Sequence, residues 1–190
     1  VAYGAQDIYL TGNPQITFFK VVYRRHTNFS METIQQTMNG TAQVPTSGTS
    51  KGNITLARNG DLVHKIYVRM VSSTTAAIVN HDAHSFITKV ELSIGGQLID
   101  KHTAEWLQVW SELTTTASQA AGYAYMTGAK GKWGSNNDST NSQGVTHAMI
   151  PLRFWFCRNP GLALPLIALQ YHEVELKFTW GGTPETAVNC

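Results

Sequence analysis

The sequence contains few charged residues, few cysteines and no long apolar run. Asp, Glu, Lys and Arg make up 14% of its 190 residues, and the formal net charge is only +2. Soluble proteins average about 25% charged residues. A protein that neutralises nucleic-acid phosphates carries a larger positive excess, so we expect no direct binding of nucleic acid. A weakly charged surface suits packing against neighbours, because charge is depleted in the cores of interfaces.

The two cysteines do not form a disulfide framework. Cys157 lies in an apolar run and Cys190 is the last residue, so a single bridge between them stays open while a reducing compartment is the simpler interpretation. No apolar stretch approaches the 18 residues of a membrane span, and no signal peptide is present. The chain begins with Val1 and ends without a clear terminal element, so we expect both ends to continue in a longer protein.

Period-two alternation of apolar residues is the strongest pattern. Over 172–180, Val174, Leu176, Phe178 and Trp180 alternate with polar residues, which predicts a strand buried on one face. Similar patterns or β-branched and aromatic residues predict further strands at 149–157, 61–71, 86–94, 15–24 and 28–38, with shorter ones at 53–57 and 97–100. Phe154 and Trp180 are expected to anchor the core.

One segment has helical spacing instead. From Ala104 to Leu113, the apolar residues Trp106, Val109, Trp110 and Leu113 recur at helical intervals, and Thr103 is a suitable N-cap. About eight strands and one short inserted helix predict an all-β fold, an eight-stranded jelly-roll β-sandwich. We expect 1–190 to form a single domain of this type.

Two stretches have the composition of loops. Gln43–Gly52 is rich in Pro, Thr, Ser and Gly, and the longer segment 114–145 is rich in Gly, Ala, Ser and Asn. Long loops inside compact domains are usually functional or disordered. The long loop carries Tyr123, Tyr125 and Trp133, which we expect to be exposed.

Residues for metal or covalent chemistry are present but poorly arranged. His81 and His84 form an H-x-x-H pair, and His102 with Glu105 forms an H-x-x-E pair. Cupin-type metal sites instead need an H-x-H pair with a following Glu and a further His. Three ligands converging on one ion are not indicated, and Cys157 has no evident base. We expect no metal, no cofactor and no catalytic residues.

Several apolar side chains are candidates for an interface. Trp155 alternates with Phe154 and Phe156, so in a strand it would face away from the core. Either a loop or the inserted helix of the same domain, or a neighbouring subunit or second domain, would then cover it. The segment Gly161–Gln170 is too apolar to stay exposed. We therefore expect a subunit or domain junction at Trp155, Leu162, Leu164, Leu166, Ile167 and Leu169.

Five segments resemble the major capsid proteins of nucleocytoplasmic large DNA viruses, especially those that infect algae and other protists. The matching segments, in the family's order, are Gly4–Lys20, Val22–Phe29, Arg58–Leu62, Ile94–His102 and Pro151–Glu173. The resemblance spans nearly the whole chain, and the departures fall at Gln43–Gly52, 72–85 and 114–145.

The resemblance implies a structural protein of the virion, with two successive jelly rolls, of which this chain would be the first. Three subunits would form a pseudo-hexagonal capsomer, and capsomers would tile an icosahedral shell around an internal membrane and a double-stranded DNA genome. The implied partners are further copies, minor capsid proteins and a penton protein. The resemblance also implies assembly in the host cytoplasm without insertion into the membrane.

Two other functions remain as alternatives. Lectins also use jelly rolls, and Tyr123, Tyr125 and Trp133 are of the type that stacks on sugars. A cupin-like metal enzyme is the third hypothesis, because that class shares the fold.

Overall fold

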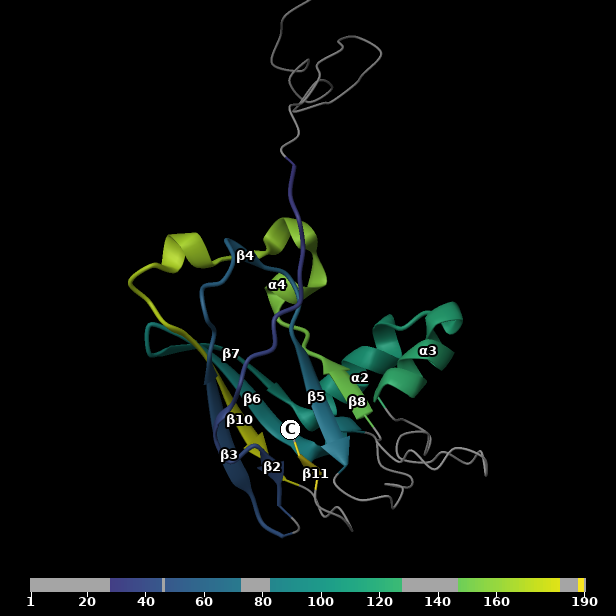
Figure 1. Cartoon of the computed structure of the whole chain (residues 1–190). Helices are drawn as coiled ribbons and strands as arrows, with labels where there is room; N and C mark the ends of the chain where they lie inside the picture. Colours follow the sequence, from purple (N-terminus) through teal and green to yellow (C-terminus); the bar gives the residue numbers. More distant parts are fainter. Residues whose placement is uncertain (1–27, 46, 73–82, 128–146, 182–187, 190) are drawn as a thin grey trace, which may run out of the picture. The chain divides into compact units, whose positions relative to one another are not determined.

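The computed structural model describes residues 28–45, 47–72, 83–127, 147–181 and 188–189 (Figure 1). Contacts divide the chain into two units, 1–35 and 36–190. Among the described residues, every strand and helix lies in the second unit. The predicted strand at 15–24 lies outside the described residues.

The second unit contains two larger antiparallel sheets. The five-stranded sheet has the order β1 (Asn39–Gly40), β3 (Ser50–Thr55), β10 (Val174–Trp180), β6 (Ile87–Ile94), β7 (Gln97–Thr103). The four-stranded sheet has the order β2 (Gln43–Val44), β11 (Val188–Asn189), β5 (Tyr67–Ser72), β8 (His147–Pro151). A two-stranded sheet joins β4 (Leu62–Val63) to β9 (Leu164–Pro165).

Strand β10 lies at the centre of the five-stranded sheet and confirms the alternation found in the sequence. Val174, Leu176, Phe178 and Trp180 are all buried, and the residues between them are not. Leu176 pairs with Ile54 of β3 on one side and with Leu92 of β6 on the other. The Phe178 and Trp180 rings are stacked with centroids 5.1 Å apart.

The core lies between the two larger sheets. It is a single cluster to which both sheets contribute, with Val90, Leu92 and Phe178 from one and Val68, Met70 and Ile150 from the other. Phe154 and Trp180 are fully buried in it, as their patterns predict.

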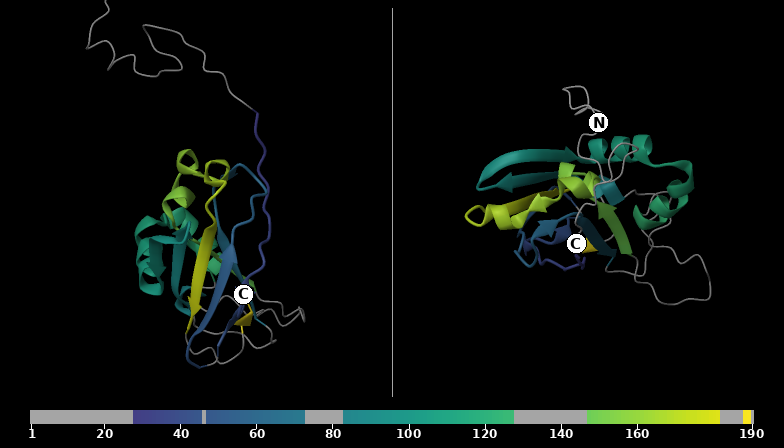
Figure 2. Two further views of the ribbon diagram at one scale, coloured as in Figure 1. Left: turned by 90° about the vertical axis from the view of Figure 1, so that its left-hand side faces the viewer. Right: turned by 90° about the horizontal axis from the view of Figure 1, so that it is seen from above.

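The chain connects the two sheets on one side, and two helices contact them on the other. Strands β1 and β2 follow each other in the chain but belong to different sheets, so the chain crosses between the sheets there. On the other side lie β7 and β8, edge strands among the described residues. Helix α2 (Ala104–Thr114) contacts β7, and helix α3 (Ala117–Thr127) contacts β8 (Figures 1 and 2). The register between β6 and β7 shifts at Leu92 and Ser93, and such irregularities discourage unwanted strand pairing.

The predicted helix is confirmed, but its predicted apolar face is wrong. Thr103 caps α2, and its hydroxyl accepts a hydrogen bond from the Trp106 backbone N–H. The buried residues of α2 are Leu107 and Ser111, whereas Val109 is 58% and Leu113 79% exposed. The aromatic pair Trp106 and Trp110 is half-buried, because α2 lies at the rim of the sandwich.

Two predicted strands are too long. The segment 61–71 is divided into β4 and β5, and Leu62 is exposed rather than in the core. The segment 149–157 remains a strand only to Pro151, and Trp155–Arg158 form the short helix α4. Leu152, Phe154 and Phe156 are nevertheless buried. Their apolar side chains therefore predicted burial correctly, but the predicted strand conformation was wrong.

Three further expectations are corrected. Residues 28–38 contain no strand, although their composition favours one. Gln43–Gly52 is not all loop, since it contains β2 and the start of β3. The expected long loop 114–145 begins with helix α3, so the described residues hold more than one inserted helix. Ala is the strongest helix former, and α3 contains four alanines in ASQAAGYAYMT.

Candidate functional site

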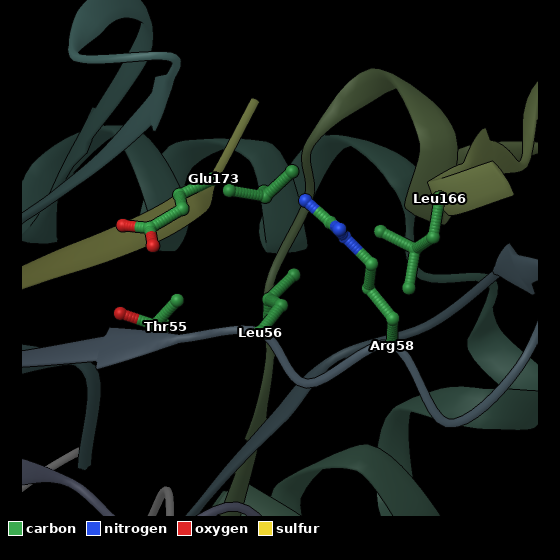
Figure 3. A pocket seen from close by; sticks show the side chains of 6 residues that line it. Thr55, Leu56, Arg58, Leu166 and Glu173 are labelled. Carbon is green, nitrogen blue, oxygen red and sulfur yellow. The ribbon is translucent and has the colours of Figure 1, made fainter. Parts of the chain in front are cut away.

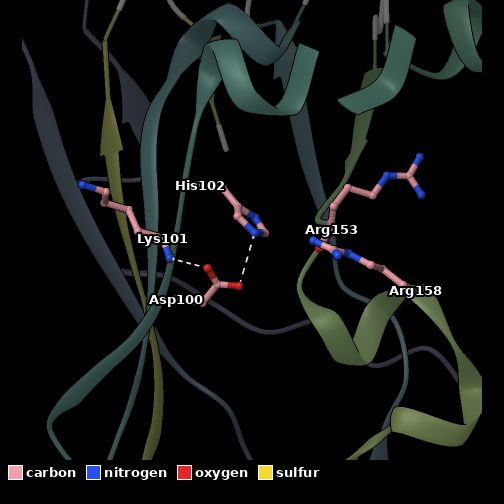
Figure 4. A network of polar contacts seen from close by, with 5 residues as sticks. All are labelled: Asp100, Lys101, His102, Arg153 and Arg158. Carbon is pink, nitrogen blue, oxygen red and sulfur yellow. Dashed lines mark hydrogen bonds and ion pairs between the residues drawn. The ribbon is translucent and has the colours of Figure 1, made fainter. Parts of the chain in front are cut away.

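A buried histidine lies where β7, α2 and the segment before α4 meet (Figure 4). The His102 side chain is 2% exposed, and its ring is stacked against Trp106 and Phe154 with centroids 4.2 and 4.3 Å away. Its Nε2 lies 3.4 Å from Asp100 Oδ2. The stack of His102 on Trp106 is formed by residues close in the sequence, because β7 ends at Thr103 and the first turn of α2 brings Trp106 back over His102.

Burial determines the charge of this histidine. Burial lowers the pKa of His102 and Arg158 lowers it further, while Asp100 acts in the opposite direction without cancelling these effects. The ring is therefore predominantly neutral at pH 7. A neutral ring packed between aromatic rings acts as part of the core rather than as an accessible acid or base.

Two arginines extend this cluster towards the helices. The guanidinium carbon Cζ of Arg158 lies 4.3 Å from the centre of the Trp110 ring, and its Nε donates a hydrogen bond to the Arg153 carbonyl at 2.9 Å. Arg153 Cζ lies 5.7 Å from the Tyr123 ring. The Tyr123 hydroxyl is in turn 3.1 Å from Nε2 of His84, a buried residue of the 3-10 helix Ala83–Phe86. Cation–π and hydrogen-bond contacts thus fasten α2 and α3 to the sandwich.

This cluster was not predicted from the sequence, in which His102 was a candidate only for a metal site with Glu105. A usable signal was present, because His102, Trp106 and Trp110 are spaced four residues apart, and such residues stack on one side of a helix and its entry. The contact with Arg158 is distant in the chain and left no such signal.

A shallow hollow of about 260 Å³ lies beside Arg58 (Figure 3). It is lined by Thr55, Leu56, Arg58, Leu166, Glu173 and Val174. Arg58 Nη2 donates hydrogen bonds to the carbonyls of Leu169 and His172, at 3.0 and 3.3 Å. Ligand pockets usually measure about 300–1,000 Å³, so the hollow is small, and the arginine in it is engaged in holding the 166–172 segment.

The six candidate interface residues fall into three groups. Leu164 and Leu166 are buried in the core, and Trp155 and Leu169 are partly buried against it. Leu162 and Ile167 are exposed. Leu62, which pairs with Pro165 across the β4–β9 sheet, is also exposed. We call Leu62, Leu162 and Ile167 the β4–β9 patch.

The aromatic residues of the expected loop are not equivalent. Tyr125 is exposed, whereas Tyr123 is half-buried under Arg153. Trp133 lies outside the described residues. Of the aromatics proposed for sugar stacking, Tyr123 is therefore already engaged in intramolecular contacts.

The residues considered for metal or covalent chemistry do not converge in the described part of the chain. Within it, no group of three His, Cys, Asp or Glu could hold a metal ion, and His81 lies outside it. Cys157 is buried in α4, and burial raises the pKa of its thiol to about 11. Cys190 lies outside the described residues. None of the described helices is long and apolar enough to span a membrane.

Known proteins match this chain in sequence and in structure. A family model described as "Major capsid protein N-terminus" matches residues 17–188. The major capsid protein of Pyramimonas orientalis virus is 53% identical over 189 residues, which are 97% of this chain and 46% of that protein. That of Paramecium bursaria Chlorella virus 1 is 47% identical over 181 residues, covering 94% of this chain and 39% of that protein.

A solved structure gives the same answer. A chain of "PBCV-1 virus capsid, quasi-atomic model" superimposes with a TM-score of 0.65 and 40% sequence identity, over 87% of this chain and 38% of that chain. The two-sheet sandwich described above is thus a jelly roll of the viral capsid class. The chain belongs to the major capsid protein family, whose N-terminal part it matches. It spans less than half the length of these relatives.

Proposed function

We propose that the protein containing this chain is the structural unit of an icosahedral shell around a large double-stranded DNA genome. The observation that carries this proposal is the family match over residues 17–188, together with the likeness to a capsid protein in its shell. Three copies form a pseudo-hexagonal capsomer, and capsomers tile the virion after assembly in the host cytoplasm.

A structural role rather than catalysis is also part of the proposal. The described residues that could do chemistry are occupied in packing: His102 lies between aromatic rings, and Cys157 is buried with a raised thiol pKa. The similar proteins are named as capsid proteins. Rigidity, which the stacked core and the anchored helices supply, is what a shell needs.

We further propose that this jelly roll is the first of two. The chain covers 46% of one relative and 39% of another, which leaves a comparable length for a second domain. The exposed β4–β9 patch is the proposed junction with that domain or with a neighbouring subunit, because Leu62 in β4 and Leu162 and Ile167 on either side of β9 are apolar and exposed. Minor capsid proteins and a penton protein are the other proposed partners, with no contact to DNA and no insertion into the internal membrane.

The first experiment is to determine the oligomeric state of the full-length protein. We expect light scattering to give a trimer and negative-stain microscopy to show hexagonal arrays. A stable monomer at high concentration would contradict the proposal and make the glycan-binding module the next hypothesis.

A further inference from the structure

The sequence contains two Asn-Gly pairs, Asn39-Gly40 and Asn59-Gly60. In such a pair the amide carbon of the asparagine side chain is within reach of the next backbone nitrogen, and glycine has no Cβ to obstruct the approach. Attack of that nitrogen on the amide releases ammonia, so an Asn-Gly pair can modify itself without an enzyme. The reaction is slow where the fold holds the glycine nitrogen in place, and the two pairs differ in this respect.

The pair Asn59-Gly60 lies in a bend between β3 and β4. Both residues are exposed, so water has access to them. Among the described residues, the Gly60 N–H finds no hydrogen-bond acceptor and the Asn59 side chain makes no hydrogen bond. A Cβ placed at Gly60 would meet nothing within 4 Å, so there is room for the side chain of Asn59 to close a ring onto the Gly60 nitrogen.

The pair Asn39-Gly40 is exposed as well, but it belongs to a strand. In the antiparallel register of β1 and β3, Asn39 pairs with Asn53 and Gly40 with Gly52. A Cβ placed at Gly40 would lie 3.3 Å from the Lys51 carbonyl oxygen, so the space around this glycine is confined. The two pairs therefore have the same two residues and similar exposure, and they differ in how the backbone is held.

The residues on either side of the bend fasten it to the segment that follows β9. Arg58, which points into the hollow of Figure 3, donates hydrogen bonds to the carbonyls of Leu169 and His172. The Asp61 carbonyl accepts a hydrogen bond from the Leu166 backbone N–H at 2.9 Å. The peptide between Arg58 and Asp61 thus connects two anchored positions, and a change in its charge or length acts on both anchors.

We propose that Asn59 converts itself to aspartate and isoaspartate in the folded protein. The Gly60 backbone nitrogen attacks Cγ of Asn59, and the new N–Cγ bond closes a five-membered succinimide ring. The Cγ–Nδ2 bond breaks, and the proton of the attacking nitrogen leaves with the side-chain nitrogen as ammonia. Water then opens the ring at Cγ to give aspartate, or at the backbone carbonyl carbon of Asn59 to give isoaspartate. No electrons are transferred, water is the co-reactant, and the inference does not depend on the proposed function.

The modification changes the surroundings of Arg58. Both products carry a carboxylate at position 59 that is ionised at pH 7, and a carboxylate is a stronger acceptor for a guanidinium than a carbonyl is. We expect it to draw Arg58 away from the carbonyls of Leu169 and His172. Isoaspartate also lengthens the backbone between the two anchors by one carbon. Ile167 of the β4–β9 patch lines the same hollow as Asn59, so the change occurs beside the proposed junction.

Peptide mapping of the full-length protein by mass spectrometry tests the modification. Folded protein is incubated at mildly alkaline pH, and the two Asn-Gly peptides are followed in the same sample. We expect Asn59 to lose its amide roughly 10-fold faster than Asn39, the ratio that corresponds to about 1.4 kcal/mol for opening the pairing of β1 with β3. In urea, where neither pair is held by the fold, the two rates should become similar.

Two sets of variants separate the reaction from its consequence. Gly60 has no positive φ angle and has space for a Cβ, so Gly60→Ala should fold like the wild type while its methyl group slows the loss of the Asn59 amide several-fold. Asn59→Asp reproduces the new charge, and Asn59→Gln is its neutral control. Hydrogen exchange at the Leu166 and His172 amides, which bond to the Asp61 and Leu169 carbonyls, should be faster in Asn59→Asp than in Asn59→Gln.

Each outcome bears on one part of the inference. Retention of the amide at Asn59 in the folded protein, or equal rates at Asn59 and Asn39, would overturn the proposal. A Gly60→Ala variant that reacts as fast as the wild type would show that the Gly60 nitrogen does not attack, and would overturn the ring mechanism. Equal hydrogen exchange in Asn59→Asp and Asn59→Gln would overturn the effect on Arg58 and leave the modification itself standing.

Discussion

The rings of His102 and Trp106 lie nearly parallel, with an interplanar angle of 12° and centroids 4.2 Å apart. His102 belongs to β7 and Trp106 to the first turn of α2, so this stack joins the sheet to the helix. Because burial lowers the pKa of the histidine, we expect the junction between sheet and helix to be sensitive to pH.

Acid should therefore weaken the fold through His102. Its pKa is lowered in the folded protein from 6.5, so below pH 6.5 the unfolded chain binds a proton more readily than the folded chain. The stabilisation is present above pH 6.5 and is lost as the pH falls towards the folded pKa. We expect His102→Phe, which keeps an aromatic ring in the stack, to show a smaller drop in melting temperature between pH 7.5 and 5.5 than the wild type. Equal drops would contradict the assignment.

Replacing Arg158 should loosen α2. Its guanidinium carbon lies 4.3 Å from the centre of the Trp110 ring, and Arg158→Ala removes that contact and the hydrogen bond to Arg153. We expect a loss of about 1–2 kcal/mol in the free energy of unfolding. Arg158→Lys keeps the charge but not the planar group, so it should fall between alanine and wild type in urea denaturation. A lysine variant no more stable than the alanine variant would argue against a cation–π contribution.

Core truncation should have a much larger effect. Trp180→Ala or Phe154→Ala removes a fully buried ring, and such changes lower the free energy of unfolding by roughly 3–5 kcal/mol. Leu113→Ala, at an exposed position, serves as the control with little expected effect. An equilibrium melt that shows less than about 1 kcal/mol for either ring would exclude it from the core.

Two adjacent glycines offer a matched comparison at the β6–β7 turn. Both Gly95 and Gly96 have positive φ angles, 59° and 83°, so alanine is strained by about 1–2 kcal/mol at either position. A Cβ at Gly95 would lie 2.7 Å from His172 Nδ1, whereas one at Gly96 would meet nothing within 4 Å. We expect Gly95→Ala to lower the melting temperature more than Gly96→Ala does. Adding His172→Ala should remove the difference, and a difference that persists would indicate another cause.

The Cys157 thiol should be unreactive in the folded protein. Burial raises its pKa to about 11, and the thiolate is the reactive form. In a Cys190→Ser variant, where Cys157 is the remaining thiol, labelling by a thiol reagent at pH 8 should be slow in buffer and fast in denaturant. Fast labelling in buffer would show that the α4 region opens readily.

The sequence was most informative where one face of an element is buried. Strand β10 and the start of α2 were predicted because apolar and polar residues alternate from Val174 to Trp180 and because Thr103 is a residue type that caps helices. The strand predicted over 149–157 was too long because Leu152, Phe154 and Phe156 are buried in an irregular segment and a short helix. Alternation of apolar and polar residues indicates which side chains are buried, and an irregular segment can bury alternate side chains just as a strand does.

The candidate site was predictable only in part. Leu162 and Ile167 are exposed in an apolar segment, as the interface prediction requires, but Leu164 and Leu166 belong to the core of this domain. Composition cannot show which residues of this apolar segment are buried and which are exposed, because that depends on where β9 pairs with β4. The contacts of Arg153 and Arg158 with Tyr123 and Trp110 depend equally on elements distant in the chain.

If the protein builds a shell as proposed, the contacts at two sheet edges have a consequence for how that shell would come apart. Helix α3 contacts β8 and α2 contacts β7, which it directly follows in the chain, so these two edges offer less backbone for a strand of another molecule to join. Contacts between copies at these two edges would then be made by side chains, and separating them would break no hydrogen bond of a sheet. Separation at these edges should consequently release folded subunits, because it does not require any strand of the sandwich to be withdrawn.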